Sequence, residues 1–96
     1  MTRLVLRRRA KADIAEIWVY TADRWSIDQA DAYNMSLEAA FDRLIVTPSL
    51  GIPCPEISEG YHRYRCGSHV IFYTLENDIL RIGRVLHQSR DFRRHL

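Results

Sequence analysis

The stretch YHRYRCGSHVIFYTLENDILRIGRVLH, residues 61–87, decides the fold of this chain. It contains three runs rich in β-branched and aromatic residues, which predict strands over Tyr61–Cys66, His69–Leu75 and Ile79–His87. Gly67-Ser68 has glycine first, as a two-residue type II′ hairpin turn requires, and Glu76-Asn77-Asp78 suits a three-residue turn. The stretch therefore predicts an antiparallel meander.

These turns also predict the register, in which Cys66 faces His69, Tyr64 faces Ile71, Leu75 faces Ile79 and Tyr73 faces Arg81. Neighbours along a strand point to opposite faces of a sheet. One face would then carry arginines among apolar residues: Arg63, Arg65, Val70, Phe72, Leu80, Ile82, Arg84 and Leu86. The other would carry most of the imidazoles and phenols: His62, Tyr64, His69, Ile71, Tyr73, Arg81, Val85 and His87. A β-bulge at Gly83 would exchange the assignments in the last strand.

The N-terminal half predicts a short strand followed by a helical hairpin. Residues 3–7 are apolar in the middle, as expected of a strand. From about residue 10 to 24, apolar side chains recur every three or four residues, which predicts an amphipathic helix with the stripe Ile14, Ile17, Trp18, Thr21 and Trp25.

A second helix is predicted over residues 27–46. Ser26 followed by Gln29 has the spacing of a capping box, and Pro48 ends the helix. Its buried stripe would be Ala30, Tyr33, Leu37, Ala40, Phe41 and Leu44. Residues 47–60 are rich in proline and glycine and predict an ordered loop, so we expect residues 1–96 to form a single domain.

Charge is segregated along the chain although its formal sum is only +2. Residues 1–11 carry five cations and no acid, residues 12–42 carry seven acids and only Arg24 as a cation, and the region from Arg63 onward is again rich in arginine. All 14 cationic residues except Lys11 are arginines, which favours fixed bidentate contacts to carboxylate or phosphate. The pattern indicates a partner surface rather than a general nucleic-acid coat.

Several classes of protein are disfavoured by the sequence. Cys54 and Cys66 are too few and too far apart for a disulfide framework or a zinc knuckle, so we expect free thiols and no metal site. The glycines are scattered, so no phosphate-binding loop and no cofactor is implied. No apolar run approaches the length of a signal peptide core or a membrane span, and we expect a cytoplasmic protein without membrane contact.

An ordered set of short motifs runs along almost the whole chain. They are Ala10-x-x-Asp13-Ile14-x-x-Ile17-x-x-Tyr20, Trp25-x-x-x-Gln29-Ala30-x-x-Tyr33, Pro48-x-x-Gly51, Gly60-Tyr61-x-x-Tyr64, Gly67-Ser68-His69-Val70-Ile71-Phe72-Tyr73 and Ile82-x-Arg84-Val85-Leu86-His87-Gln88. Together they resemble the ParE branch of the RelE/ParE toxin superfamily. One departure is Arg7, which stands where the family commonly has a Ser or Thr that caps the first helix, a contact that contributes about 1 kcal/mol.

The resemblance implies an α+β fold, with an N-terminal strand and a helical hairpin packed on an antiparallel sheet. It implies a toxin of a type II toxin-antitoxin system that inhibits DNA gyrase and blocks replication. A ParD-like antitoxin would neutralise it by laying a helix and an extended segment over the toxin in a hetero-oligomer. Whether the toxin contacts DNA directly stays open.

Two alternatives remain beside this interpretation. The RelE branch includes ribosome-dependent mRNA endonucleases, whose chemistry needs His or Glu together with Arg and Tyr. The predicted register divides such a set, because it puts Arg84 on the face opposite Arg81 and His87, so we expect no enzymatic activity and a structural role for His87. The second alternative is a non-toxic member that only binds antitoxin.

Candidate contact residues follow from these interpretations. Target contacts are expected among the C-terminal basic residues and His87: Arg81, Arg84, His87, Arg90, Arg93 and Arg94. Arg84 has a competing structural role, since Asp13 and Glu16 on the first helix offer it an ion pair. Antitoxin contacts are expected on the helical hairpin, at Ile17, Tyr20, Trp25, Tyr33 and Leu37, wherever these side chains are exposed rather than part of the core.

Overall fold

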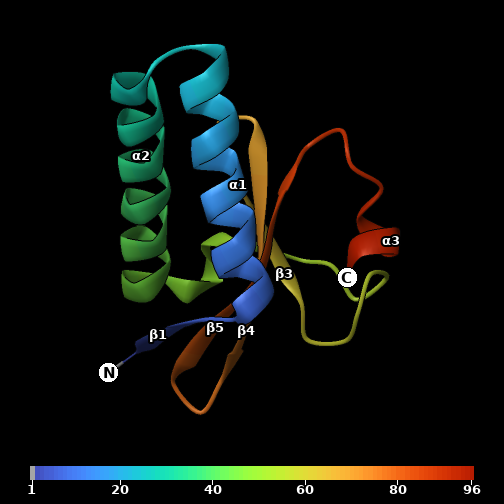
Figure 1. The fold of residues 1–96 in the computed structure, drawn as a ribbon. Helices are drawn as coiled ribbons and strands as arrows, with labels where there is room; N and C mark the ends of the chain where they lie inside the picture. The colour runs from blue at the N-terminus through green and yellow to red at the C-terminus, as the bar shows by residue number, and fades with distance from the viewer. Residues whose placement is uncertain (1) are drawn as a thin grey trace.

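A computed structural model describes residues 2–96 of the chain (Figure 1). Along the chain the elements are β1 (Arg3–Leu6), α1 (Arg8–Arg24), α2 (Ile27–Val46), the 3₁₀-helix η1 (Pro48–Leu50), β2 (Ile52–Pro53), β3 (His62–Cys66), β4 (His69–Glu76), β5 (Ile79–His87) and α3 (Phe92–His95). The α+β class and the order of a strand, two helices and three strands are confirmed. The short elements η1, β2 and α3 are additional to the predicted ones.

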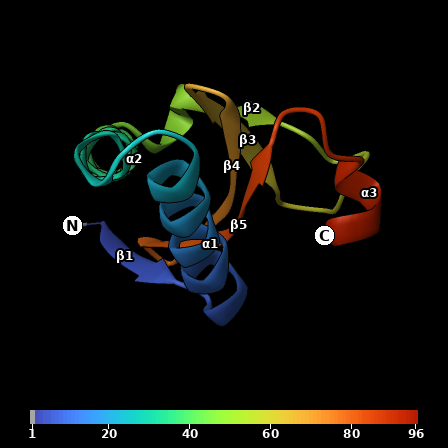
Figure 2. The same cartoon turned by 45° about the horizontal axis from the view of Figure 1, so that its top comes forward.

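All strands form one sheet in the order β1-β5-β4-β3-β2. β1 lies parallel to β5 at one edge, and every other neighbouring pair is antiparallel. Figure 2 shows α1 and α2 side by side on one face of the sheet, while α3 lies on the other side. No helix within residues 2–96 combines the length and the apolar character needed to cross a membrane.

The two long helices begin differently. Ser26 caps α2 as predicted, because its hydroxyl accepts the backbone N–H of Gln29 at 3.0 Å. α1 starts at Arg8, two residues earlier than expected, and Arg7 at its N-cap position makes no side-chain capping bond. The departure at Arg7 therefore leaves the first turn of α1 without a side-chain partner for its amides.

The β3–β4 hairpin follows the prediction. Gly67 has a φ of 58°, a conformation that glycine adopts at little cost, and the register pairs Cys66 with His69 and Tyr64 with Ile71. A Cβ on Gly67 would also collide with the ring of Tyr33 on α2. The turn thus needs glycine for its backbone and for the approach of the helix.

The predicted register of the β4–β5 hairpin is wrong by one residue. The turn contains only Asn77 and Asp78, which have φ values of 52° and 62°, so Glu76 faces Ile79 and Thr74 faces Arg81. Asn and Asp tolerate this left-handed conformation, which permits the tighter turn. The N-terminal half of β5 is therefore rotated relative to the prediction: Leu80 and Ile82 face the helices, and Arg81 faces away from them.

A β-bulge at Gly83 restores the predicted faces in the rest of β5. The register shifts between Phe72 and Tyr73 of β4, so that Ile82 faces Tyr73, Arg84 faces Phe72 and Gly83 has no partner. His87 consequently faces His69 on the helical side of the sheet. The bulge that the sequence permitted is present, and it limits the misassignment to Leu80, Arg81 and Ile82.

Each face of the sheet has its own apolar core. The larger one lies under α1 and α2 and contains Ala10, Leu37, Ala40, Phe41, Leu44, Cys66, Ile71, Tyr73, Leu80, Ile82 and Val85. The predicted stripe of α2 is buried apart from the half-buried Tyr33, and its buried members other than Ala30 belong to this core. The smaller one contains Cys54, Val70, Phe72 and Leu86, covered by Ile57, Tyr61, Phe92 and Leu96. Both cysteines are buried free thiols.

One tyrosine from the sheet holds the first part of the loop over residues 47–60. The hydroxyl of Tyr73 donates to the carbonyl of Pro48 at 2.6 Å and accepts the N–H of Gly51 at 2.9 Å. Burial raises the pKa of Tyr73, which keeps the phenol neutral. The expectation of an ordered loop is confirmed.

Candidate functional site

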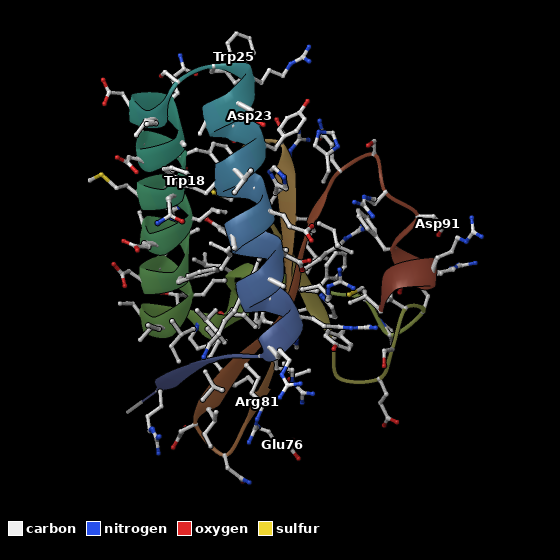
Figure 3. All side chains as sticks on the ribbon, in the orientation of Figure 1. Trp18, Asp23, Trp25, Glu76, Arg81 and Asp91 are labelled. Carbon is white, nitrogen blue, oxygen red and sulfur yellow. The ribbon has the colours of Figure 1, made fainter. Side chains whose placement is uncertain are left out.

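An apolar surface is exposed at the end of the helical hairpin. Its members, called here the hairpin surface, are more than half exposed: Val19, Tyr20, Trp25 and Ile27. Trp25 projects from the end of α1 in Figure 3. Exposed aromatic side chains of this kind are typical anchors at protein interfaces. Tyr20 and Trp25, two of the predicted antitoxin contacts, therefore lie where a partner can reach them.

The other predicted antitoxin contacts lie deeper. Leu37 is only 1% exposed and belongs to the core, so its side chain offers no contact surface. Ile17 and Tyr33 are half-buried against the same core. Trp18 joins the two helices, because its indole N–H donates to Asp31 on α2 at 2.9 Å. Helical spacing assigned the predicted antitoxin contacts to the helical hairpin, but only the packing of the helices determines which of these side chains are exposed and which are buried.

Arg84 forms the predicted ion pair with Asp13. Its Nε and one terminal nitrogen donate to the two carboxylate oxygens at 2.8 and 2.9 Å, and the backbone N–H of Val85 donates to Asp13 at 2.9 Å. The two side chains are only 15% and 10% exposed. The hydrogen bonds that Arg84 donates to Asp13 raise the pKa of Arg84. This contact fastens α1 to β5 just beyond the bulge.

A cleft of about 460 Å³ lies between α1 and the end of β5. It is lined by acidic, imidazole and apolar groups together with one arginine: Asp13, Glu16, Ile17, Tyr20, His69, Val85, Leu86, His87, Ser89 and Arg90. We call it the imidazole cleft. The rings of His69 and His87 meet edge to face with their centroids 5.4 Å apart.

Each of the two histidines is held by a hydrogen bond to a neighbouring residue. The Tyr33 hydroxyl is hydrogen-bonded to Nδ1 of His69 at 2.6 Å, and burial followed by the charge of His87 lowers the pKa of His69 to about 4. The N–H of Ser89 donates to Nδ1 of His87 at 3.1 Å, so the proton of a neutral His87 sits on Nε2. His87 thus closes the strand through a hydrogen bond, in line with its expected structural role.

The C-terminal segment 88–96, called the tail, is anchored by α3. Phe92 packs edge to face on Phe72 with the ring centroids 4.8 Å apart, and Asp91 accepts the N–H of Arg93 at 3.2 Å. Arg90, Arg93 and Arg94 are all exposed. The tail therefore contains a short helix docked on the second core.

The predicted target residues do not form one cluster. Arg81 lies near the β4–β5 turn beside Glu76, whereas Asp91, which belongs to the tail, lies on another side of the molecule (Figure 3). Arg84 is engaged by Asp13, His87 lines the imidazole cleft, and the remaining arginines lie on the tail. The partnership of His69 with Tyr33 and His87 was not predicted, because neither sequence spacing nor motif relates these residues.

Comparison with known proteins identifies relatives over the whole fold. The sequence profile described as "ParE toxin of type II toxin-antitoxin system, parDE" matches residues 4–92. Toxin ParE1 of Mycobacterium tuberculosis is 41% identical over 96 residues, which cover 99% of this chain and 98% of that protein. Toxin ParE1 of Caulobacter vibrioides is 43% identical over 91 residues, which cover 95% of this chain and 94% of that protein.

Solved structures share the fold. A chain of the chromosomal ParDE TA system from P. aeruginosa superposes with a TM-score of 0.80 at 16% identity, covering 91% of this chain and 96% of that one. A chain of the toxin-antitoxin complex RelBE2 from Mycobacterium tuberculosis gives a TM-score of 0.65 at 20% identity, covering 91% and 98%. These structural similarities support the fold assignment, whereas the sequence profile and the two ParE1 relatives establish the family. The chain belongs to the ParE toxin family of type II toxin-antitoxin systems.

Proposed function

We propose that this toxin arrests growth by binding DNA gyrase and stalling it on DNA, and that it breaks no bond with its own side chains. Family membership supports a toxin. The observation that carries the mode of action is the docked tail. Because Phe92 is packed on Phe72, Arg93 and Arg94 are presented on a fixed helix rather than on a loose end. A preorganised basic group loses less entropy when it binds an acidic partner surface.

The test replaces Arg90, Arg93 and Arg94 together by alanine. We expect the variant to lose growth arrest on expression and to leave gyrase supercoiling uninhibited in a purified assay. A matched control replaces the exposed Arg3, Arg63 and Arg65, which removes the same charge from β1 and β3, and this variant should stay toxic. Toxicity that survives in the tail variant would remove the tail from the mechanism.

We also propose that a ParD-like antitoxin covers the hairpin surface. The family description pairs the toxin with an antitoxin in parDE, and both structural neighbours come from toxin-antitoxin systems. An amphipathic helix of the partner would use Tyr20 and Trp25 as anchors. Replacing both by glutamate should weaken co-purification with the antitoxin but leave growth arrest intact, whereas the tail variant should show the opposite pattern.

The imidazole cleft favours a second candidate, an endoribonuclease. It brings His69 and His87 next to Glu16, Tyr20 and Arg90, which are residue types suited to acid-base cleavage of RNA. Purified toxin incubated with translating ribosomes distinguishes the two functions. Cleavage of mRNA with many turnovers, lost on His87→Gln, would refute the binding mechanism, while uncut mRNA and blocked supercoiling would support it. Harmless overexpression would instead indicate a member that only binds antitoxin.

A further inference from the structure

A second cavity, of about 410 Å³, lies where the start of α1 meets the bulge in β5 and the end of the tail. It is lined by four arginines, a tyrosine, a glycine and a leucine: Arg7, Arg8, Arg9, Arg84, Tyr61, Gly83 and Leu96. We call it the arginine cavity. It shares no lining residue with the imidazole cleft or the hairpin surface.

The side chains that line the arginine cavity include four arginines and no acidic residue. The first acidic residue of the chain is Asp13, whose two carboxylate oxygens are already bonded to Arg84. None of Arg7, Arg8 and Arg9 makes an ion pair or a side-chain hydrogen bond with another residue of the described range 2–96. Three guanidinium groups at one edge of the cavity therefore have donors available to a ligand.

The backbone and Tyr61 add further donors. α1 has neither a capping side chain nor an acidic residue in its first turn, so the positive end of its dipole adds to the arginine charge. Cations are unfavourable at this end of a helix, and an anion would relieve the repulsion. The Tyr61 hydroxyl makes no hydrogen bond within residues 2–96 and lies over Gly83, where a Cβ would come within 2.8 Å of it.

We propose that the arginine cavity binds a phosphate group. The planar guanidinium donates two parallel hydrogen bonds to phosphate, and several such groups around one cavity suit a multiply charged oxyanion better than a single carboxylate. The phosphate belongs either to the backbone of a nucleic acid or to a free polyphosphate, because both present the same oxygens. The inference does not depend on gyrase being the target.

The first test measures binding of pyrophosphate to the purified full-length chain by isothermal titration calorimetry. Arg7→Gln, Arg8→Gln and Arg9→Gln are combined in one variant, and Arg3→Gln, Arg24→Gln and Arg63→Gln in a control with the same formal net charge of −1, which is +2 less three cations. We expect the first variant to bind about tenfold or more weakly and the control to change by less than about twofold. The melting temperature of the Arg7, Arg8 and Arg9 variant should stay equal to that of the unchanged protein or rise, because its substitutions remove cations from the start of α1.

The second arm separates the two sources of phosphate. Fluorescence anisotropy with a short labelled DNA duplex is measured over a range of salt concentrations. If a backbone phosphate occupies the cavity, the duplex binds, and the log-log slope of affinity against salt becomes shallower by about 0.9 for each phosphate that the cavity variant no longer neutralises. Pyrophosphate binding without duplex binding assigns the site to a free polyphosphate. The proposal is overturned if neither probe binds, or if both variants weaken binding equally.

Discussion

Removing the carboxylate of Asp13 should be the most damaging single change to an ionisable side chain in this fold. Asp13 accepts two hydrogen bonds from Arg84 and one from the backbone of Val85, and it is 8% exposed. Asp13→Ala removes the carboxylate that accepts two hydrogen bonds from a largely buried guanidinium, and it leaves the buried amide of Val85 without an acceptor.

The expected cost follows from these contacts. Deleting one partner of a buried ion pair costs roughly 3–5 kcal/mol, most of it from the charge that is left behind. In a domain of this size that corresponds to a fall in melting temperature of roughly 12–30 °C. Asp13→Asn keeps one oxygen as an acceptor, so we expect a smaller loss of about 2 kcal/mol.

Urea denaturation followed by circular dichroism measures these free energies of unfolding. The matched control is Asp31→Asn, which removes an exposed carboxylate that accepts a hydrogen bond from Trp18, and it should cost less than about 1 kcal/mol. A double variant, Asp13→Leu with Arg84→Met, removes both charges. It should recover at least half of the loss but not all, since the N–H of Val85 still lacks an acceptor.

Two results would refute this reasoning. If Asp13→Ala costs less than about 1 kcal/mol, the ion pair is solvated and does not hold α1 on β5. If the double variant is no more stable than Asp13→Ala, the loss comes from packing around Asp13 and not from the lost ion pair with Arg84.

Three further changes probe other parts of the structure. The pKa of His69 falls from 6.5 to about 4 on folding, so the unfolded chain binds more protons between these values and stability decreases as the pH falls through this window. For a half-exposed ring we expect roughly 1–2 kcal/mol. The pH profile should be flatter in His69→Gln and, to a smaller extent, in His87→Gln, which removes the second cause of the shift. Gly51→Ala places a Cβ against the buried Tyr73 hydroxyl and should cost about 2–4 kcal/mol in urea unfolding, whereas a loss below about 1 kcal/mol would mean that the loop yields easily. Asp78→Gly relieves a φ of 62° in the β4–β5 turn and should raise stability by about 0.5–1 kcal/mol; an unchanged midpoint would show that the turn is not strained.

Sequence alone was sufficient where the controlling residues are neighbours in the chain. Ser26 and Pro48 delimit α2 because a cap and a missing amide act within one turn. Gly67 determines the β3–β4 turn, and that turn determines the register of both strands. The pairing of Arg84 with Asp13 was also predictable, since a charge on an apolar strand requires a partner and α1 carries acids.

Tertiary structure alone decided what depends on contacts distant in sequence. The strands β4 and β5 could be joined by either of two turns. The shorter turn and the bulge at Gly83 each shift the register by one residue, because burial of Leu80 and Ile82 under the helices outweighed regular pairing along the whole strand. Trp25 and Leu37 have equivalent spacing in their helical stripes, yet one is exposed and the other buried. Helical periodicity specifies a direction around the helix axis, whereas exposure depends on whether another element covers that direction. The same reason explains why the His69–His87 contact and the arginine cavity emerged only from the fold: each is made by segments that approach one another only after the sheet and the hairpin have packed.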